Sequence, residues 1–112
     1  MSGGGKDREE TLRSFDEAVN MTAGELEKWL KTEESRGAGQ SDGSGESVGH
    51  ASGRRIVDLL RTRKADLTDD DVAHMRKVVG YVHRHVSQRP DGDVTDTRWR
   101  HSLMNWGHDP TK

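Results

Sequence analysis

The spacing of apolar residues constrains this chain most, because it repeats at the period of an α-helix and never alternates as in a strand. The most regular segment is Asp69–Gln88. At about 100° per residue, its apolar side chains fall within roughly 120° of arc. Such a stripe has to be covered, so we predict that this helix packs against a core. Its inward-facing residues are Val72, Met75, Val78, Val79, Val82 and Val86.

Four further segments show the same periodicity. Thr22 with Glu25, and Thr68 with Asp71, have the spacing of capping boxes, and Gly107 is placed to end the last helix. The chain is therefore predicted to be all-α, with four to five short helices around one small core. The further helices are expected over Asp7–Asn20, directly after Thr22, over Ser52–Lys64 and over Thr95–Trp106. Their predicted core residues are Leu12, Phe15, Val19, Leu26, Trp29, Leu30, Ile56, Val57, Leu59, Leu60, Trp99, Leu103 and Trp106.

Glycine and serine mark two segments outside these helices. Residues 1–6 are predicted to be a flexible tail and residues 7–112 a single helical domain, because 112 residues leave room for one core. Residues 35–53 contain six glycines and several serines, so we expect a mobile loop between the second and third helices. With 29% apolar and 34% charged residues, the core is expected to be modest.

The cellular setting is constrained by what the sequence lacks. It contains no cysteine, which excludes disulfides, thiolate metal sites and thiol catalysis. Met1–Glu10 has no apolar run, and no stretch approaches the roughly 18 apolar residues of a membrane span. We therefore expect a cytoplasmic protein that does not enter the membrane.

Gly45-Glu46-Ser47-Val48-Gly49 matches the G-x-S-x-G motif of the nucleophile elbow. That elbow strains its serine between a strand and a helix of a parallel sheet, and no strand is predicted here. We interpret Ser47 as an ordinary loop serine or a helix cap. The same loop lacks the Gly-Lys-Ser/Thr ending of a phosphate-binding loop.

Six histidines raise the question of a metal site. Ligands on one helix need spacings of three or four, whereas His83 and His85 are two apart, and His74 and His85 are eleven apart. We expect surface or hydrogen-bonded histidines and no metal. A site assembled from separate helices is the alternative.

Positive charge is concentrated in the second half of the chain. Residues 1–47 carry a net charge of −5 and residues 48–112 carry +3. Around the third helix, five cations accompany a single acid, Asp58, and no acid occurs from Val72 to Pro90. On the fourth helix, the cations and Gly80 lie clear of the apolar arc, with Tyr81 and His83 at its edges. These two helices are the candidate surface for nucleic acid, provided that their cations lie side by side.

The alternative interpretation of these cations is ordinary solvation. A charged face opposite an apolar one is typical of any soluble helix, and arginines often pair with acids such as those of the N-terminal half. Asp69, Asp70 and Asp71 also occupy the first turn of the fourth helix, where a recognition helix usually meets DNA. Contact through the middle of that helix remains open.

Two tryptophans, Trp99 and Trp106, lie in the last predicted helix. Tryptophans at helical spacing are usually core residues, which is the interpretation that we favour. The alternatives are a groove for a partner protein and an exposed platform for stacking.

Several runs of residues resemble a family found in bacteria and fungi and designated domain of unknown function 3140. The resemblance covers nearly everything after the N-terminal tail, but the chain departs from the family pattern between Gly37 and Gly45. It implies little about activity, because the family has no established reaction; members are sometimes labelled DNA-binding. The runs are Asn20–Thr22, Glu25–Leu30, Lys31–Ser35, Glu46–His50, Ser52–Val57, His74–His85 and Asn105–Pro110.

We therefore expect a non-enzymatic helical module, without a cofactor, that binds nucleic acid, with DNA preferred, mainly through the phosphate backbone. The alternative is a protein-interaction or stress-associated module that uses the Trp99/Trp106 segment or the acidic first helices. An enzyme ranks third, because the acids and bases form no recognisable constellation. The predicted phosphate contacts are Arg54, Arg55, Arg61, Arg63, Lys64, Arg76, Lys77 and Arg84.

Overall fold

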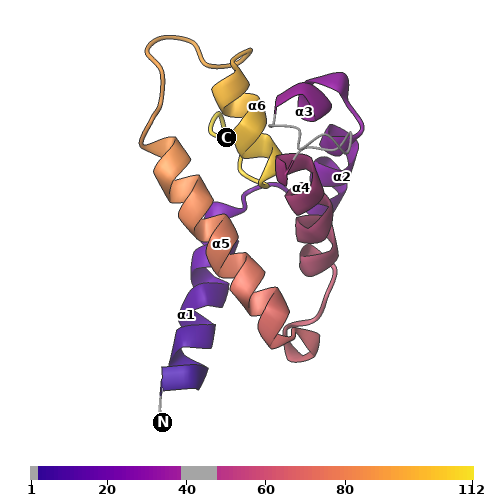
Figure 1. The fold of residues 1–112 in the computed structure, drawn as a ribbon, viewed down its shortest axis with the longest axis vertical. Coiled ribbons are helices and arrows are strands. Elements are labelled where there is room, and N and C mark those ends of the chain that lie inside the picture. The colour runs from indigo at the N-terminus through magenta and orange to yellow at the C-terminus, as the bar shows by residue number, and fades with distance from the viewer. Residues whose placement is uncertain (1–2, 39–47) are drawn as a thin grey trace.

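A computed structural model describes residues 3–38 and 48–112, with side chains from Arg8 to Ala38 and from Gly49 onward (Figure 1). These residues form α-helices joined by short connections and contain no strand, which confirms the predicted all-helical fold. The α-helices are α1 (Gly3–Ala18), α2 (Ala23–Leu30), α3 (Glu33–Ala38), α4 (Val48–Leu60), α5 (Asp69–Val86) and α6 (Arg98–Asn105), and a 3-10 helix, η1 (Lys64–Asp66), lies between α4 and α5.

The helices pack in pairs. The main contacts join α1 with α5, α2 with α4, and α3 with α6, and α6 also contacts α2, α4 and α5. In Figure 1, α5 crosses α1 on one side of the molecule, while α2, α3 and α4 gather on the other side next to α6. Helix α6 therefore ties the two groups together.

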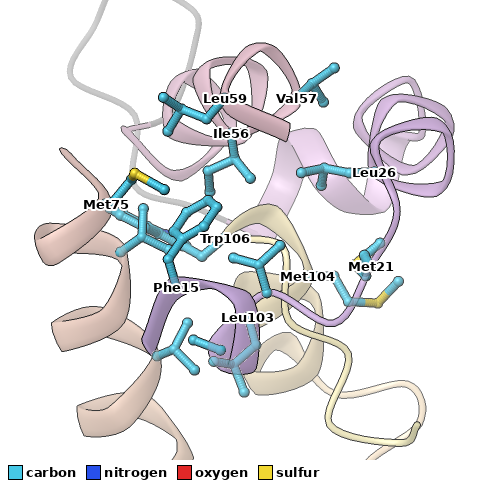
Figure 2. Close-up of a cluster of buried hydrophobic side chains, with 14 of the residues drawn as sticks. Phe15, Met21, Leu26, Ile56, Val57, Leu59, Met75, Leu103, Met104 and Trp106 are labelled. Atoms are coloured by element: carbon cyan, nitrogen blue, oxygen red, sulfur yellow. The ribbon is translucent and has the colours of Figure 1, made fainter. Parts of the chain in front are cut away.

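One core joins these helices. Phe15, Leu26 and Ile56 are at most 1% exposed, and they come from α1, α2 and α4. Figure 2 shows Phe15 and Ile56 close to Trp106, which follows α6. Burying a side chain of this size contributes roughly 1.5 to 3 kcal/mol, so a few such residues account for much of the stability of a small domain.

Local signals in the sequence fix three helix ends as predicted. The capping box at α2 is complete, because the Thr22 amide donates to Glu25 Oε1 at 2.8 Å and the Glu25 amide donates to Thr22 Oγ1 at 3.1 Å. Thr68 and Asp71 form the same arrangement at the start of α5. Gly107 has φ +81°, the left-handed conformation that lets glycine end a helix.

The predicted loop over residues 35–53 was wrong at both ends. Its beginning belongs to α3, which continues to Ala38, and its end belongs to α4, which starts at Val48 instead of Ser52. The centre of the segment, with Gly45 to Ser47 of the G-x-S-x-G motif, lies outside the described residues. Every residue of the segment that the structure describes is therefore helical.

Glycines misled this prediction because they serve close packing. A Cβ on Gly53 would lie 2.5 Å from the Asn105 carbonyl oxygen and 2.6 Å from Leu30 Cδ2, and one on Gly49 would lie 3.2 Å from Trp106 Nε1. Small residues there let α4 approach α2 and the end of α6, and the gain in packing offsets the low helix propensity of glycine.

Several smaller details also differ from the prediction. Helix α1 begins at Gly3, within the segment predicted as a tail, and ends at Ala18. Lys64 belongs to η1 and not to the third predicted helix. Val86, predicted to face the core, is 40% exposed, because α5 extends past the residues that α1 and α6 cover.

Candidate nucleic-acid interface

The eight predicted phosphate contacts are all exposed, but they are spread over several elements. Arg54 and Arg55 lie on α4, and Arg61 follows its last turn. Arg63 and Lys64 lie at η1. Helix α5 carries the remaining three cations, Arg76, Lys77 and Arg84.

Carboxylates neutralise much of the charge around α4 and η1. Arg61 pairs with Glu27 of α2 at 3.0 Å, and Lys64 approaches Asp16 of α1 at 3.8 Å. These two acids come from the first third of the chain. Arg63 pairs with Asp66 at 3.0 Å, and Arg55 pairs with Asp71 at 3.4 Å. Arg55, Arg61, Arg63 and Lys64 are thus ion-paired with carboxylates of described residues.

The two cationic helices also diverge in space. One hydrogen bond links them: Ser52 Oγ, near the start of α4, lies 3.0 Å from His74 Nε2, in the second turn of α5. In Figure 1 the two helices lie at an angle and separate away from η1, and α6 contacts both of them. The structure therefore brings Arg55 close to α5 but does not align the two sets of cations along their length.

The outer face of α5 retains unpaired charge. Lys77 and Arg84 are exposed and form no ion pair with any described residue. They are seven residues apart, so both lie on one side of the helix, about 10 Å apart along its axis. Gly80 lies between them, and Arg84 Nη1 would be 3.4 Å from a Cβ there, so the guanidinium folds back over this glycine.

Arg76 borders this face and is held by α1. Its Nε donates to Thr11 Oγ1 at 3.1 Å, in a cleft of about 470 Å³ between α1 and α5 that Glu10 also lines. Because Glu10 of α1 lies in the same cleft as Arg76, the edge of the α5 face at Arg76 is less positive than the sequence of α5 alone indicates.

A column of stacked rings occupies the opposite flank of α5. Tyr81 stacks on Trp106 with centroids 4.2 Å apart and on His85 at 5.1 Å. His74 and Trp99 extend the column at its two ends. Trp99 is 9% and Trp106 4% exposed, which confirms their interpretation as core residues. The rings are engaged with one another and do not offer a platform for bases.

Burial keeps the two histidines of this column neutral near pH 7. Desolvation lowers the pKa of His85, against a smaller opposing effect from the Trp99 contact. Desolvation also lowers the pKa of His74, and the nearby cations Arg55 and Lys77 add to the effect. The column therefore adds no positive charge to the α5 face at neutral pH.

Of the other four histidines, two make hydrogen bonds and His83 is exposed, in agreement with the predicted surface or hydrogen-bonded histidines. His50 Nε2 donates to the Leu30 carbonyl at 2.7 Å, and His108 Nδ1 donates to the Ala18 carbonyl at 2.7 Å. Among the described residues, no three metal-ligating side chains gather around one point. Across the described helices, none combines the length and apolar character needed to cross a bilayer.

A polar clasp holds the C-terminus, and no pattern in the sequence predicted it. Arg100 donates two hydrogen bonds to Asp109, both at 3.1 Å. Asn20 exchanges a pair of hydrogen bonds with the Asp109 backbone, at 2.7 and 3.0 Å. The Met21 amide donates to the Gly107 carbonyl at 3.2 Å. These contacts give the runs Asn20–Thr22 and Asn105–Pro110 a structural role.

The clasp also depends on the carboxyl group of Asp109, which stays ionised well below the usual pH. Burial raises the pKa of Asp109, but the hydrogen bonds from Arg100 and Thr111 outweigh burial and bring the pKa to about 2. Asp109 is therefore ionised at any physiological pH, and its charge is used inside the fold.

Comparison with known proteins supports the family resemblance. Residues 14–104 match the family described as Protein of unknown function (DUF3140). The match runs from α1 to α6 and covers more than half of the chain. No curated protein and no solved structure shows a significant match.

Proposed function

The chain belongs to this family of unknown function, and we propose that it is a non-enzymatic module that binds nucleic acid, preferentially DNA, weakly through the outer face of α5. In this proposal Lys77 and Arg84 make the main phosphate contacts and Arg76 contributes from the edge. The protein would act in the cytoplasm.

One observation carries the proposal: Lys77 and Arg84 are exposed, share one side of a regular helix, and form no ion pair with a described residue. Cations without a carboxylate partner keep their attraction for phosphate, whereas paired cations lose most of it. Gly80 between them has no side chain of its own, and the Arg84 guanidinium that folds back over it is placed to meet a phosphate close to the helix backbone.

The ion pairs around α4 explain why binding is expected to be weak. Arg55, Arg61, Arg63 and Lys64 would have to leave a carboxylate before they bind a phosphate. We therefore expect two to three phosphate contacts instead of the eight that the sequence indicated. With so few contacts, affinity should be near that of non-specific binding, at roughly 10⁻⁴ to 10⁻⁶ M.

The alternative remains a protein-interaction or stress-associated module, now with fewer surfaces for the partner. Burial of Trp99 and Trp106 removes the groove that would have used them. The exposed carboxylates Glu9, Glu10 and Glu17 on α1 are the surface left for a basic partner. A partner captured by the full chain and retained after charge reversal at Lys77 and Arg84 would favour this alternative.

The proposal can be tested by fluorescence anisotropy with a labelled DNA duplex at increasing salt. Each phosphate contact contributes about 0.9 to the slope of log K against log salt, so we expect a slope of roughly −2 to −3. Scrambling the duplex sequence should change little. Absence of binding at low salt, or binding that does not respond to salt, would rule out this mode.

A further inference from the structure

The cleft between α1 and α5 contains opposite charges that do not pair with each other. Its volume is about 470 Å³, and both Glu10 of α1 and Arg76 of α5 line it. Neither side chain makes an ion pair with a described residue, although they lie in the same cleft. A ligand that enters the cleft therefore meets one available cation and one available anion.

A hydrogen bond orients the guanidinium group of Arg76. Its Nε donates to Thr11 Oγ1 at 3.1 Å, while its two Nη groups make no hydrogen bond with a described residue. Because a guanidinium is planar, a contact at Nε also restricts the direction of the two Nη groups. These groups form a fork that can donate two parallel hydrogen bonds to one carboxylate. Arg76 is therefore oriented in advance as a receptor for a carboxylate.

The rest of the lining adds acceptors on α1 and an apolar surface on α5. Glu10 and Ser14 are four residues apart, so they share a face of α1, and the Ser14 hydroxyl makes no hydrogen bond with a described residue. A carboxylate and a hydroxyl oxygen both accept hydrogen bonds from an ammonium group. Val79 is three residues from Arg76 on α5 and is half-buried, so it gives the cleft an apolar wall.

This combination suits a small zwitterion better than an ion of one sign. A simple anion would meet the carboxylate of Glu10, and a simple cation would meet the guanidinium of Arg76, so either would be opposed by a like charge. A free α-amino acid carries one carboxylate and one ammonium group near neutral pH, and both are attached to the same carbon atom. The cleft volume lies in the lower part of the range for small-molecule sites, which favours a small ligand.

We propose that this cleft binds a free α-amino acid with a small apolar side chain. Arg76 holds the carboxylate, Glu10 and Ser14 accept from the ammonium group, and Val79 contacts the apolar side chain. The site shares Arg76 with the edge of the α5 face but does not rest on nucleic-acid binding, because Lys77 and Arg84 are not part of its lining.

The probe for this site is L-valine, titrated into ¹⁵N-labelled full-length protein near neutral pH and followed by NMR. We expect saturable shifts in the amides of residues 10–14 and 76–80. Isovalerate is valine without the ammonium group, and isobutylamine is valine without the carboxylate. Each analogue should bind at least about fivefold more weakly than valine, because it lacks one of the two recognised charges.

Two variants assign the two charges of the ligand to their partners. In the Arg76→Gln protein the carboxylate has lost its receptor, so the advantage of valine over isobutylamine should disappear while its advantage over isovalerate remains. Glu10→Gln should have the opposite effect, removing only the advantage over isovalerate. Arg13→Gln and Glu9→Gln make the same changes of charge at exposed positions of α1 outside the lining, and they should leave all affinities within about twofold.

The parent protein alone can overturn the proposal. Binding of either analogue as tightly as valine, or the absence of saturable shifts with valine, would contradict a site for a zwitterion. Among the variants, equal losses for the cleft and control substitutions, or the same effect of Arg76→Gln and Glu10→Gln on both analogues, would also contradict it. Circular dichroism of each variant verifies that the helices are intact.

Discussion

Asn105 of α6 binds Ser35 of α3 at two points: its Nδ2 donates to the Ser35 carbonyl oxygen at 2.9 Å, and its Oδ1 accepts from the Ser35 hydroxyl. The same Oδ1 accepts from Trp29 Nε1 at 2.8 Å. Asn105 and Ser35 are both fully buried. One carboxamide thereby joins α6 to α2 and α3, and every one of these polar groups depends on the others.

Replacing Asn105 with alanine should destabilise the fold by about 3 kcal/mol. The substitution leaves the Ser35 groups buried without their partner and the part-buried Trp29 indole N–H without its acceptor. Each unpaired buried group costs about 1 to 3 kcal/mol, partly recovered by relaxation. Urea unfolding monitored by circular dichroism measures the change. Ser87→Ala, at an exposed position, is the control and should lie within about 0.5 kcal/mol of the parent. A loss below about 1 kcal/mol for Asn105→Ala would show that the network is not needed.

Two glycines in helices should respond to alanine in opposite directions. Gly53→Ala places a methyl group 2.5 Å from a backbone oxygen, so we expect a loss of about 2 kcal/mol or more. Gly80→Ala meets only the flexible end of Arg84 at 3.4 Å, so the better helix propensity of alanine should stabilise by about 0.5 to 1 kcal/mol. The unfolding temperatures of the two variants test whether α4 packs closely against its neighbours at Gly53. A Gly53→Ala protein more stable than the parent would contradict this close packing.

The clasp between Arg100 and Asp109 should make stability depend on acid. The folded pKa of Asp109, about 2, is lower than its ordinary value of 3.8. The stabilisation is therefore fully present above pH 3.8 and is lost as the pH falls through about 2. It amounts to about 2 kcal/mol. The difference in unfolding free energy between the parent and Asp109→Asn should shrink by this amount between about pH 5 and pH 2. A difference that stays constant with pH would assign the effect to packing alone.

Replacing His85 with phenylalanine should stabilise the folded protein. Its Nε2 is buried and has no hydrogen-bond partner among the described residues, and burial lowers its pKa. Because the folded pKa is depressed, the unfolded chain takes up the proton first, and stability falls as the pH drops below about 6.5. His85→Phe keeps a ring between Tyr81 and Trp99 and removes both costs. We expect it to be more stable by about 1 kcal/mol at neutral pH and by more at pH 5.5 to 6, as measured by chemical denaturation. A destabilised variant at both pH values would show that the imidazole makes a contact of its own.

Elements with local signals could be predicted from the sequence. Helix α5 begins at the predicted residue and ends two residues early, because its cap and its apolar stripe lie within the segment itself. The burial of Phe15, Ile56 and Leu103 also follows from helical spacing. Helix α3 could not be found in this way, since Ser35 is held by Asn105, seventy residues later in the chain.

The candidate surface was harder to predict than the core. The sequence identifies each cation, but its partner depends on the tertiary fold: Arg61 meets Glu27 and Lys64 meets Asp16 only because α4 and η1 lie next to α2 and α1. Glycine near Gly53 was interpreted as a sign of a loop, although its role is close packing. Neither distinction can be made without knowing which helices are neighbours.

A comparison of two double variants tests the central claim, that unpaired cations on α5 carry nucleic-acid binding. Lys77→Gln/Arg84→Gln and Arg61→Gln/Arg63→Gln change the net charge equally, but only the first pair lies on the α5 face. In anisotropy titrations with a DNA duplex, the first double variant should reduce the slope of log K against log salt by about 2 and the second should leave it nearly unchanged. Equal reductions, or a loss confined to the second double variant, would contradict the assignment of binding to α5.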